Sequence, residues 1–108
     1  MTLEEKRNYA WVGDAVLALF ARRWILQQAK STSTSKERAD LFQAMTSNEF
    51  LSHFGEPTQI ECEIGMLFEN EGLTKANHYI ETQLLPNFIK KQRQKKQPGR
   101  YSRKKLSK

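Results

Sequence analysis

The longest apolar stretch of the chain runs from Tyr9 to Ala21 and predicts a central helix. Apolar and polar positions do not alternate there, and Ala and Leu are frequent, which favours a helix over a strand. Because the stretch is apolar on nearly all sides, we expect neighbouring helices or a partner chain to cover it. The helix is predicted to begin near Thr2 and to end near Gln28.

Four further helices are predicted from capping residues and from apolar positions at helical spacing. Capping boxes that begin at Thr34 and at Thr46 open the second and third helices. Pro57 fits the first turn of the fourth, and Thr74 can cap the last. Pro86 predicts a break or kink in that last helix. No run of residues alternates as a strand would, so we predict an all-α domain of about five helices.

Charge divides the chain into an acidic body and a basic tail. The chain has a net charge of +6, but residues 90–108 hold ten Lys or Arg and no acid, so residues 1–89 carry a net charge of −4. With Pro98 and Gly99 inside it, the tail is predicted to be largely disordered in isolation. Such a density of positive charge favours salt-dependent contact with nucleic acid over a merely solubilising role. The residues predicted to contact RNA are Lys90, Lys91, Arg93, Lys95, Lys96, Arg100, Arg103, Lys104 and Lys105.

Composition also bounds the compartment. The single cysteine, Cys62, excludes an internal disulfide and fits a reducing environment. Asp14 and Arg22 interrupt the longest apolar run well short of a membrane span, and no secretory segment is visible. We therefore expect a soluble, cytoplasmic protein that does not enter a membrane.

Asp14 is the first candidate for chemistry. In a helix it would lie beside small and apolar side chains, where an ionised carboxylate is costly unless a cation, a metal or strong donors pair with it. The preceding Gly13 adds roughly 1 kcal/mol of cost relative to Ala in a helix interior. The structural alternative is an ion pair with Arg7, Arg22 or Arg23.

Glu61 is a second acid of the same kind. It belongs to the helix that begins at Pro57 and shares a face with Gly65 and Phe68. Two such carboxylates on two packed helices would suit Mg²⁺, which prefers one or two protein carboxylates and leaves its other positions to water and substrate phosphate. The structural alternative is that Glu61 pairs with a lysine.

The remaining reactive or titratable side chains predict structural roles. The two histidines, His53 and His78, have no partner at metal-ligand spacing, and Cys62 has no nearby His or second Cys. We expect core positions for Cys62, Trp11 and Trp24. A solvated face is expected for Glu63, Glu69 and Glu71.

Residues 9–17, YAWVGDAVL, resemble the signature helix of the ribonuclease III domain, in which an apolar run leads into Gly-Asp-Ala. Residues 61–73, ECEIGMLFENEGL, resemble a later helix of that family, with a Gly four residues after its Glu and a closing Gly-Leu. Ser47-Asn48-Glu49 is similar to a short segment between them, and Leu84-Leu85-Pro86 to the last helix. The likeness runs in order from about residue 9 to residue 88.

This resemblance implies a helical domain that forms a homodimer and uses Asp14 and Glu61 as catalytic ligands for Mg²⁺, or alternatively Mn²⁺. The implied activity is hydrolysis of phosphodiester bonds in double-stranded or structured RNA, with ribosomal RNA precursors among the substrates. Many family members carry further acids where this chain has Ala10 and Thr58. Small or hydroxyl residues at those places are typical of the minimal Mini-III subgroup, which has no separate domain for binding double-stranded RNA.

Two other functions remain open from the sequence. One is a catalytically impaired module with the same fold that binds structured or ribosomal RNA. The other is a helical interaction domain with an unrelated basic tail. The first predicts RNA binding that is indifferent to Mg²⁺ and falls steeply with salt, and the second predicts no RNA binding.

Overall fold

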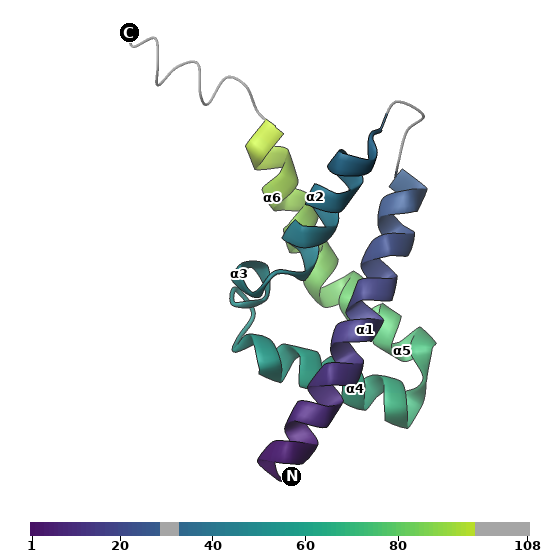
Figure 1. Ribbon diagram of the computed structural model, residues 1–108, viewed down its shortest axis with the longest axis vertical. Coiled ribbons are helices and arrows are strands. Elements are labelled where there is room, and N and C mark those ends of the chain that lie inside the picture. The colour runs from purple at the N-terminus through teal and green to yellow at the C-terminus, as the bar shows by residue number, and fades with distance from the viewer. Residues whose placement is uncertain (29–32, 97–108) are drawn as a thin grey trace, which may run out of the picture.

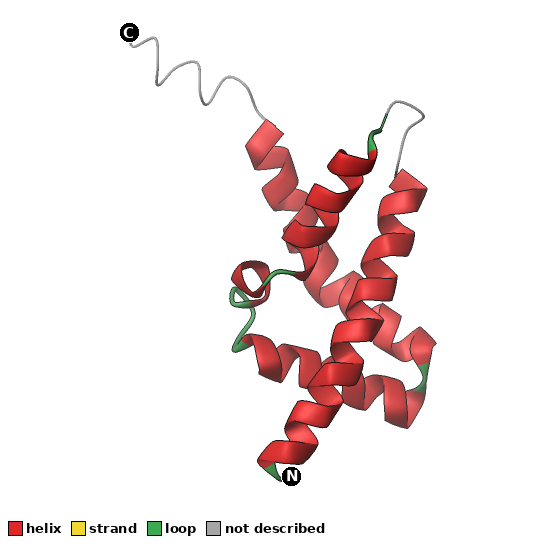
Figure 2. Ribbon diagram, in the orientation of Figure 1, coloured by secondary structure: helices red, strands yellow, loops and turns green. Residues whose placement is uncertain are grey.

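A computed structural model of the chain describes residues 1–28 and 33–96, and every element in these two ranges is helical (Figures 1 and 2). The all-α prediction is therefore confirmed. In chain order the elements are α1 (Leu3–Gln28), α2 (Ser35–Thr46), α3 (Asn48–Leu51), α4 (Pro57–Glu71), α5 (Leu73–Tyr79), the π-helical segment η1 (Ile80–Leu84) and α6 (Leu85–Lys96).

Local capping explains where three of the helices begin. At the start of α1, the Thr2 amide donates to the Glu5 side chain at 2.8 Å, and the Glu5 amide donates to the Thr2 hydroxyl at 3.1 Å. Thr34 and Glu37 form the predicted capping box of α2. Pro57 occupies the first turn of α4, as predicted from its fixed φ and missing N–H.

Two predicted caps are wrong. Ser47, and not Thr46, caps α3, because its extended backbone lets its Oγ accept from the Phe50 amide at 3.1 Å. Thr46 is still inside α2 and donates its hydroxyl to the carbonyl of Phe42. The last helical run begins after Gly72, which has a φ of 94° and no side chain to cap with, and Thr74 already lies within α5.

Of the predicted break or kink at Pro86, the break is wrong, because a wider helical turn precedes the proline and the helix continues. A proline lacks the N–H of the helical hydrogen bond, and its ring clashes with the carbonyl four residues back in a regular α-helix. Here Leu85 donates its N–H to the carbonyl of Ile80, five residues back, as in a π-helix. The run from α5 through η1 to α6 therefore continues past Pro86.

The prediction that disorder begins at Lys90 is wrong for residues 90–96. These residues continue α6, which no breaker interrupts before Pro98 and whose preceding turn is anchored by the buried Phe88 and the half-buried Ile89. The rest of the predicted RNA-binding tail, with Arg100, Arg103, Lys104 and Lys105, lies outside the described residues.

The core lies around the C-terminal half of α1, with α4 crossing the N-terminal half (Figure 1). Phe88 of α6 is buried and meets the ring of Trp24 at a centroid distance of 5.9 Å and that of Phe50 at 5.6 Å, both edge to face. Trp24 therefore has the packing role predicted for it, and Cys62 is buried as predicted.

Trp11 is not in the core. Its side chain is 81% exposed, and Leu19 and Leu26 on the same helix are 43% and 64% exposed. At separations of eight and seven residues the three share one side of α1, which we call the exposed face of α1. The sequence predicted that neighbouring helices or a partner would cover α1, and within the described chain no helix covers this face. None of the described helices is long and apolar enough to cross a membrane.

Candidate carboxylate site

The helices α1 and α4 touch through their backbones at a pair of glycines. A Cβ atom added to Gly13 would overlap the carbonyl oxygen of Glu61 and lie 2.9 Å from the amide nitrogen of Gly65. A Cβ atom added to Gly65 would overlap the carbonyl oxygen of Tyr9. Any larger residue at either position would push the helices apart. The close contact of α1 and α4 therefore requires glycine at both positions.

This contact places the two predicted acids together. Asp14 follows Gly13 directly on α1, and Glu61 is the residue of α4 against which Gly13 packs. The Asp14 side chain is exposed and that of Glu61 is half-buried, so the pair opens to solvent from the crossing. The sequence predicted two carboxylates on two packed helices, and the structure brings their side chains within hydrogen-bonding reach of one another.

The pKa of the Glu61 carboxyl group is raised at this site. Burial, then a hydrogen bond with Asp14, then the negative charges of Asp14 and Glu56 raise the pKa of Glu61 from 4.5 to about 7. Glu61 therefore keeps its proton to a higher pH than an ordinary glutamate, and a cation bound at the pair would favour its ionised form.

The ion-pair alternatives are not found. Within residues 1–28 and 33–96 the ion pairs are Lys6 with Glu56 and Lys36 with Asp40, and neither includes Asp14 or Glu61. Arg22 instead lies over the ring of Phe42, at 4.3 Å from its centroid.

The two carboxylates are the right type of ligand for a divalent cation of the Mg²⁺ class, but they are few in number. Carboxylate oxygens are the ligands that such an ion prefers, and their unrelieved repulsion favours a cation between them. However, the part of the chain that is described contains no group of three or more acidic, His or Cys side chains that could hold a metal. Ala10 is buried and Thr58 is half-buried at the start of α4, and neither of these two side chains can add a carboxylate to the pair. A cation here would have two protein carboxylates.

The role of the two glycines is not evident from the sequence. The sequence predicts Gly13 as a local cost and Gly65 as a neighbour of Glu61, whereas in the structure both form the contact that builds the site. A mid-helix glycine in an apolar run was the available signal, because such a position is expensive unless another backbone approaches it closely.

Glu63 differs from its prediction, because it does not lie on a solvated face. It accepts a 3.1 Å hydrogen bond from the Tyr79 hydroxyl and one from the Gln59 amide, and burial together with Glu63 raises the pKa of Tyr79 to about 12. His53 and His78 are both exposed, in agreement with the structural roles predicted for them, and Nε2 of His53 lies 2.8 Å from Nζ of Lys91.

The raised pKa of Glu61 predicts a change of stability with pH. A folded-state pKa of about 7 against 4.5 means that the folded chain holds this proton more tightly, so its stabilising contribution is complete below pH 4.5 and is lost as the pH rises through 7. Between pH 4.5 and pH 7 in metal-free buffer, thermal melts should show that the free energy of unfolding of the wild type falls relative to that of Glu61→Gln. The expected difference is on the order of 1 kcal/mol after discounting for solvent exposure. The exposed Glu69→Gln should follow the wild type, and parallel curves for wild type and Glu61→Gln would contradict the coupling.

Comparison of the chain with protein-family models, with curated proteins and with solved structures finds no match in any of the three. Inference about function therefore starts from the residues and from their geometry.

Proposed function

We propose that this protein is a Mg²⁺-dependent endoribonuclease of the ribonuclease III type that hydrolyses double-stranded or structured RNA. The observation that carries the proposal is the convergence of Asp14 and Glu61 across a backbone contact between α1 and α4. Both acids come from the two segments that resemble the family, and neither has an ion-pair partner in the described chain. Mini-III is the subgroup that the chain resembles most.

The chemical roles follow from the two carboxylates. Asp14 and Glu61 would hold the cation, Mg²⁺ or alternatively Mn²⁺, which when bound supplies polarisation of the scissile phosphate and an activated water. The exposed Asp14 leaves the outer side of the pair open to a phosphate of the RNA. The close crossing of α1 and α4 fixes the spacing of the two acids, so binding a cation requires little rearrangement.

A cleavage assay tests the proposal. The intact protein, incubated with a structured ribosomal RNA precursor or a long RNA duplex, should cut it with Mg²⁺ and should stop on addition of a chelator. Products with 5′-phosphate and 3′-hydroxyl ends are expected. An intact, folded protein that cuts neither RNA at any Mg²⁺ concentration would overturn the proposal.

A second candidate is a catalytically impaired module of the same fold that binds structured or ribosomal RNA. The observation that favours it is the lack of a third acid beside Asp14 and Glu61 in the described chain. The same assay distinguishes this candidate from the nuclease, because the protein would bind the RNA without cutting it. That binding would not depend on Mg²⁺.

We also propose that the protein is a homodimer and that its two copies meet through the exposed face of α1. Trp11, Leu19 and Leu26 leave large apolar side chains in water on one side of the central helix, and such a patch commonly marks an interaction surface. A second copy offers the same patch, so a two-fold contact would cover both at once.

Charge at Trp11 should break that dimer. Trp11→Asp replaces the most exposed large apolar side chain with a charge, and loss of a central aromatic contact weakens association by roughly 30-fold or more. Light scattering after size exclusion should show a dimer for the wild type and a monomer for the variant at the same micromolar concentration. Gln43→Asp adds the same charge at an exposed position on α2 and should stay dimeric. A monomeric wild type would contradict the proposal.

A further inference from the structure

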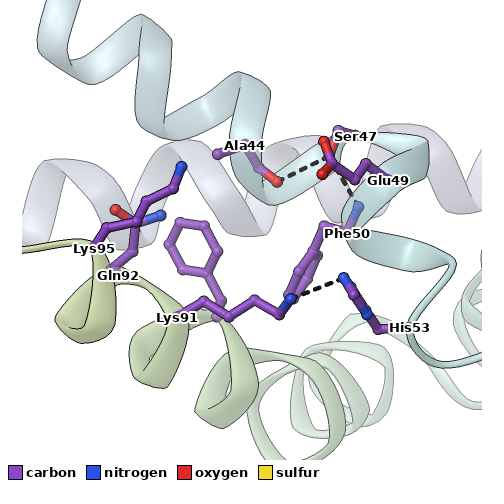
Figure 3. Close-up of a pocket in the computed structure, with 9 residues that line it drawn as sticks. Ala44, Ser47, Glu49, Phe50, His53, Lys91, Gln92 and Lys95 are labelled. Atoms are coloured by element: carbon purple, nitrogen blue, oxygen red, sulfur yellow. Dashed lines mark hydrogen bonds between the residues drawn. The ribbon is translucent and has the colours of Figure 1, made fainter. Parts of the chain in front are cut away.

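A pocket with charged side chains lies away from the carboxylate pair, between α6 and the turn that joins α2 to α3 (Figure 3). Its volume is about 140 Å³, and the buried rings of Phe50 and Phe88 form its apolar floor. On one side Lys91, Gln92 and Lys95 project from a single face of α6, at three, four and seven residues from Phe88.

Lys91 is a cation that forms no ion pair within the described part of the chain. Its Nζ lies 2.8 Å from Nε2 of His53, and no carboxylate in the described ranges forms an ion pair with Lys91 or Lys95. An ammonium group can only donate, so the Lys91 ammonium would donate to the His53 nitrogen in this contact. The pocket therefore has two positive charges one helical turn apart, and neither forms an ion pair within residues 1–28 and 33–96.

The opposite side of the pocket carries an acceptor. Figure 3 shows Glu49 across the pocket from Lys95, beside Ser47. The Ser47 hydroxyl is already used, since it donates to the Ala44 carbonyl and accepts from the Phe50 amide, both at 3.1 Å. The exposed Glu49 carboxylate forms no ion pair with either lysine, so it remains available to accept a hydrogen bond from a ligand.

We propose that this pocket binds one ribonucleotide of the RNA, with the backbone phosphate held by Lys91 and Lys95 and the ribose 2′-hydroxyl donating to Glu49. Two lysines with an acid opposite match a group that presents an anion and a hydroxyl donor together. A bare anion would gain nothing from Glu49, and a deoxyribonucleotide has no hydroxyl to donate to it. The 2′-hydroxyl is the group by which proteins distinguish RNA from DNA.

The inference deepens the proposed function and rests on it, because it assigns the recognition of RNA over DNA to residues outside the carboxylate site. It also separates the basic residues of α6 into two kinds. Lys91 and Lys95 contact a defined phosphate, whereas Lys90 and Arg93 add charge to the surface.

The contact between Lys91 and a phosphate can be tested by fluorescence anisotropy in metal-free buffer. The assay measures the binding of a short RNA duplex and of the DNA duplex of the same sequence. Lys91→Gln should weaken the binding of both duplexes about tenfold, because a charge-assisted hydrogen bond is lost. Lys90→Gln removes the same charge one residue away and should cost clearly less. Equal losses for the two variants would overturn the phosphate contact.

Glu49→Ala tests the ribose contact in the same assay. The ratio of RNA affinity to DNA affinity should fall roughly tenfold, as expected when one hydrogen bond to a charged group is removed. Glu69→Ala removes an exposed acid of α4, outside the pocket, and should leave the ratio unchanged. If Glu49→Ala strengthens the binding of both duplexes equally, Glu49 only repels phosphate and the ribose contact is wrong.

Failure of the pocket and failure of the proposed function give different results. Wild-type protein that binds RNA while the Lys91 and Glu49 variants behave like their controls rejects the pocket alone. Wild-type protein that binds neither duplex rejects the proposed RNA substrate, and the pocket with it. Thermal melts of each variant exclude unfolding as the cause of a loss.

Discussion

Asp14→Asn and Glu61→Gln should each reduce the rate of RNA cleavage by roughly 10³-fold, since a catalytic cation contributes several kcal/mol and each 1.36 kcal/mol is tenfold in rate. Either change removes a negative oxygen while keeping the size of the side chain. The remaining carboxylate cannot hold a hard cation of the Mg²⁺ class as tightly on its own.

The same two variants should be no less stable than the wild type. Burial first, and then the neighbouring Asp14, raise the pKa of Glu61, so neutralising either acid removes an unfavourable burial or repulsion of charge from the folded state. Loss of activity together with equal or higher thermal stability would distinguish a functional pair of acids from a structural one.

Glu69→Gln is the matched control for both changes. Glu69 is an exposed acid on the same helix as Glu61, eight residues further along. Single-turnover cleavage by this variant should stay within about twofold of the wild type, in line with the small effects of surface substitutions. Undiminished cutting by either Asp14→Asn or Glu61→Gln would remove the catalytic assignment.

Gly65→Ala should destabilise the fold by roughly 3 kcal/mol or more, although helix propensity alone favours Ala by about 1 kcal/mol. The added methyl group would overlap the backbone carbonyl of Tyr9, which cannot move without separating α1 from α4. Chemical denaturation should show the midpoint shifted to lower denaturant. Any folded fraction should also bind Mg²⁺ more weakly, because the acids would be further apart.

Gly72→Ala is the matched control, since no atom lies within 4 Å of the methyl group it adds. Its positive φ of 94° should still cost about 1–2 kcal/mol, because an L side chain is strained there. A stabilising Gly65→Ala would mean that the helices do not touch at this point, and the explanation of the site would be wrong.

Local signals were sufficient to predict most helix starts. The capping box at Thr34 and the proline at Pro57 act within one turn of chain, so their meaning does not depend on the rest of the fold. The cap at Ser47 differed from the prediction by one residue, because Ser and Thr are adjacent there and only the backbone conformation decides between them.

Features that depend on contacts between distant residues could not be predicted in the same way. The position of each acid followed from the sequence, but their convergence depends on Gly13 meeting Gly65, fifty-two residues apart in the chain. The exposure of Trp11 depends on which side of an apolar helix the other helices leave free. The pocket at Lys91 was not predicted, because it requires α6 to continue past Lys90 and to face the turn near His53.

The π-helical segment η1 also determines which way the side chains of α6 point. Ala76, Ile80, Leu84 and Phe88 are all buried and follow one another at intervals of four residues. In a regular α-helix each such interval turns the side chain by about 40°, so Phe88 would point about 120° away from Ala76. A wider turn compensates for this phase difference and keeps all four on the core side. Lys91 and Lys95 therefore owe their orientation to a change of helical pitch that occurs more than one turn before them.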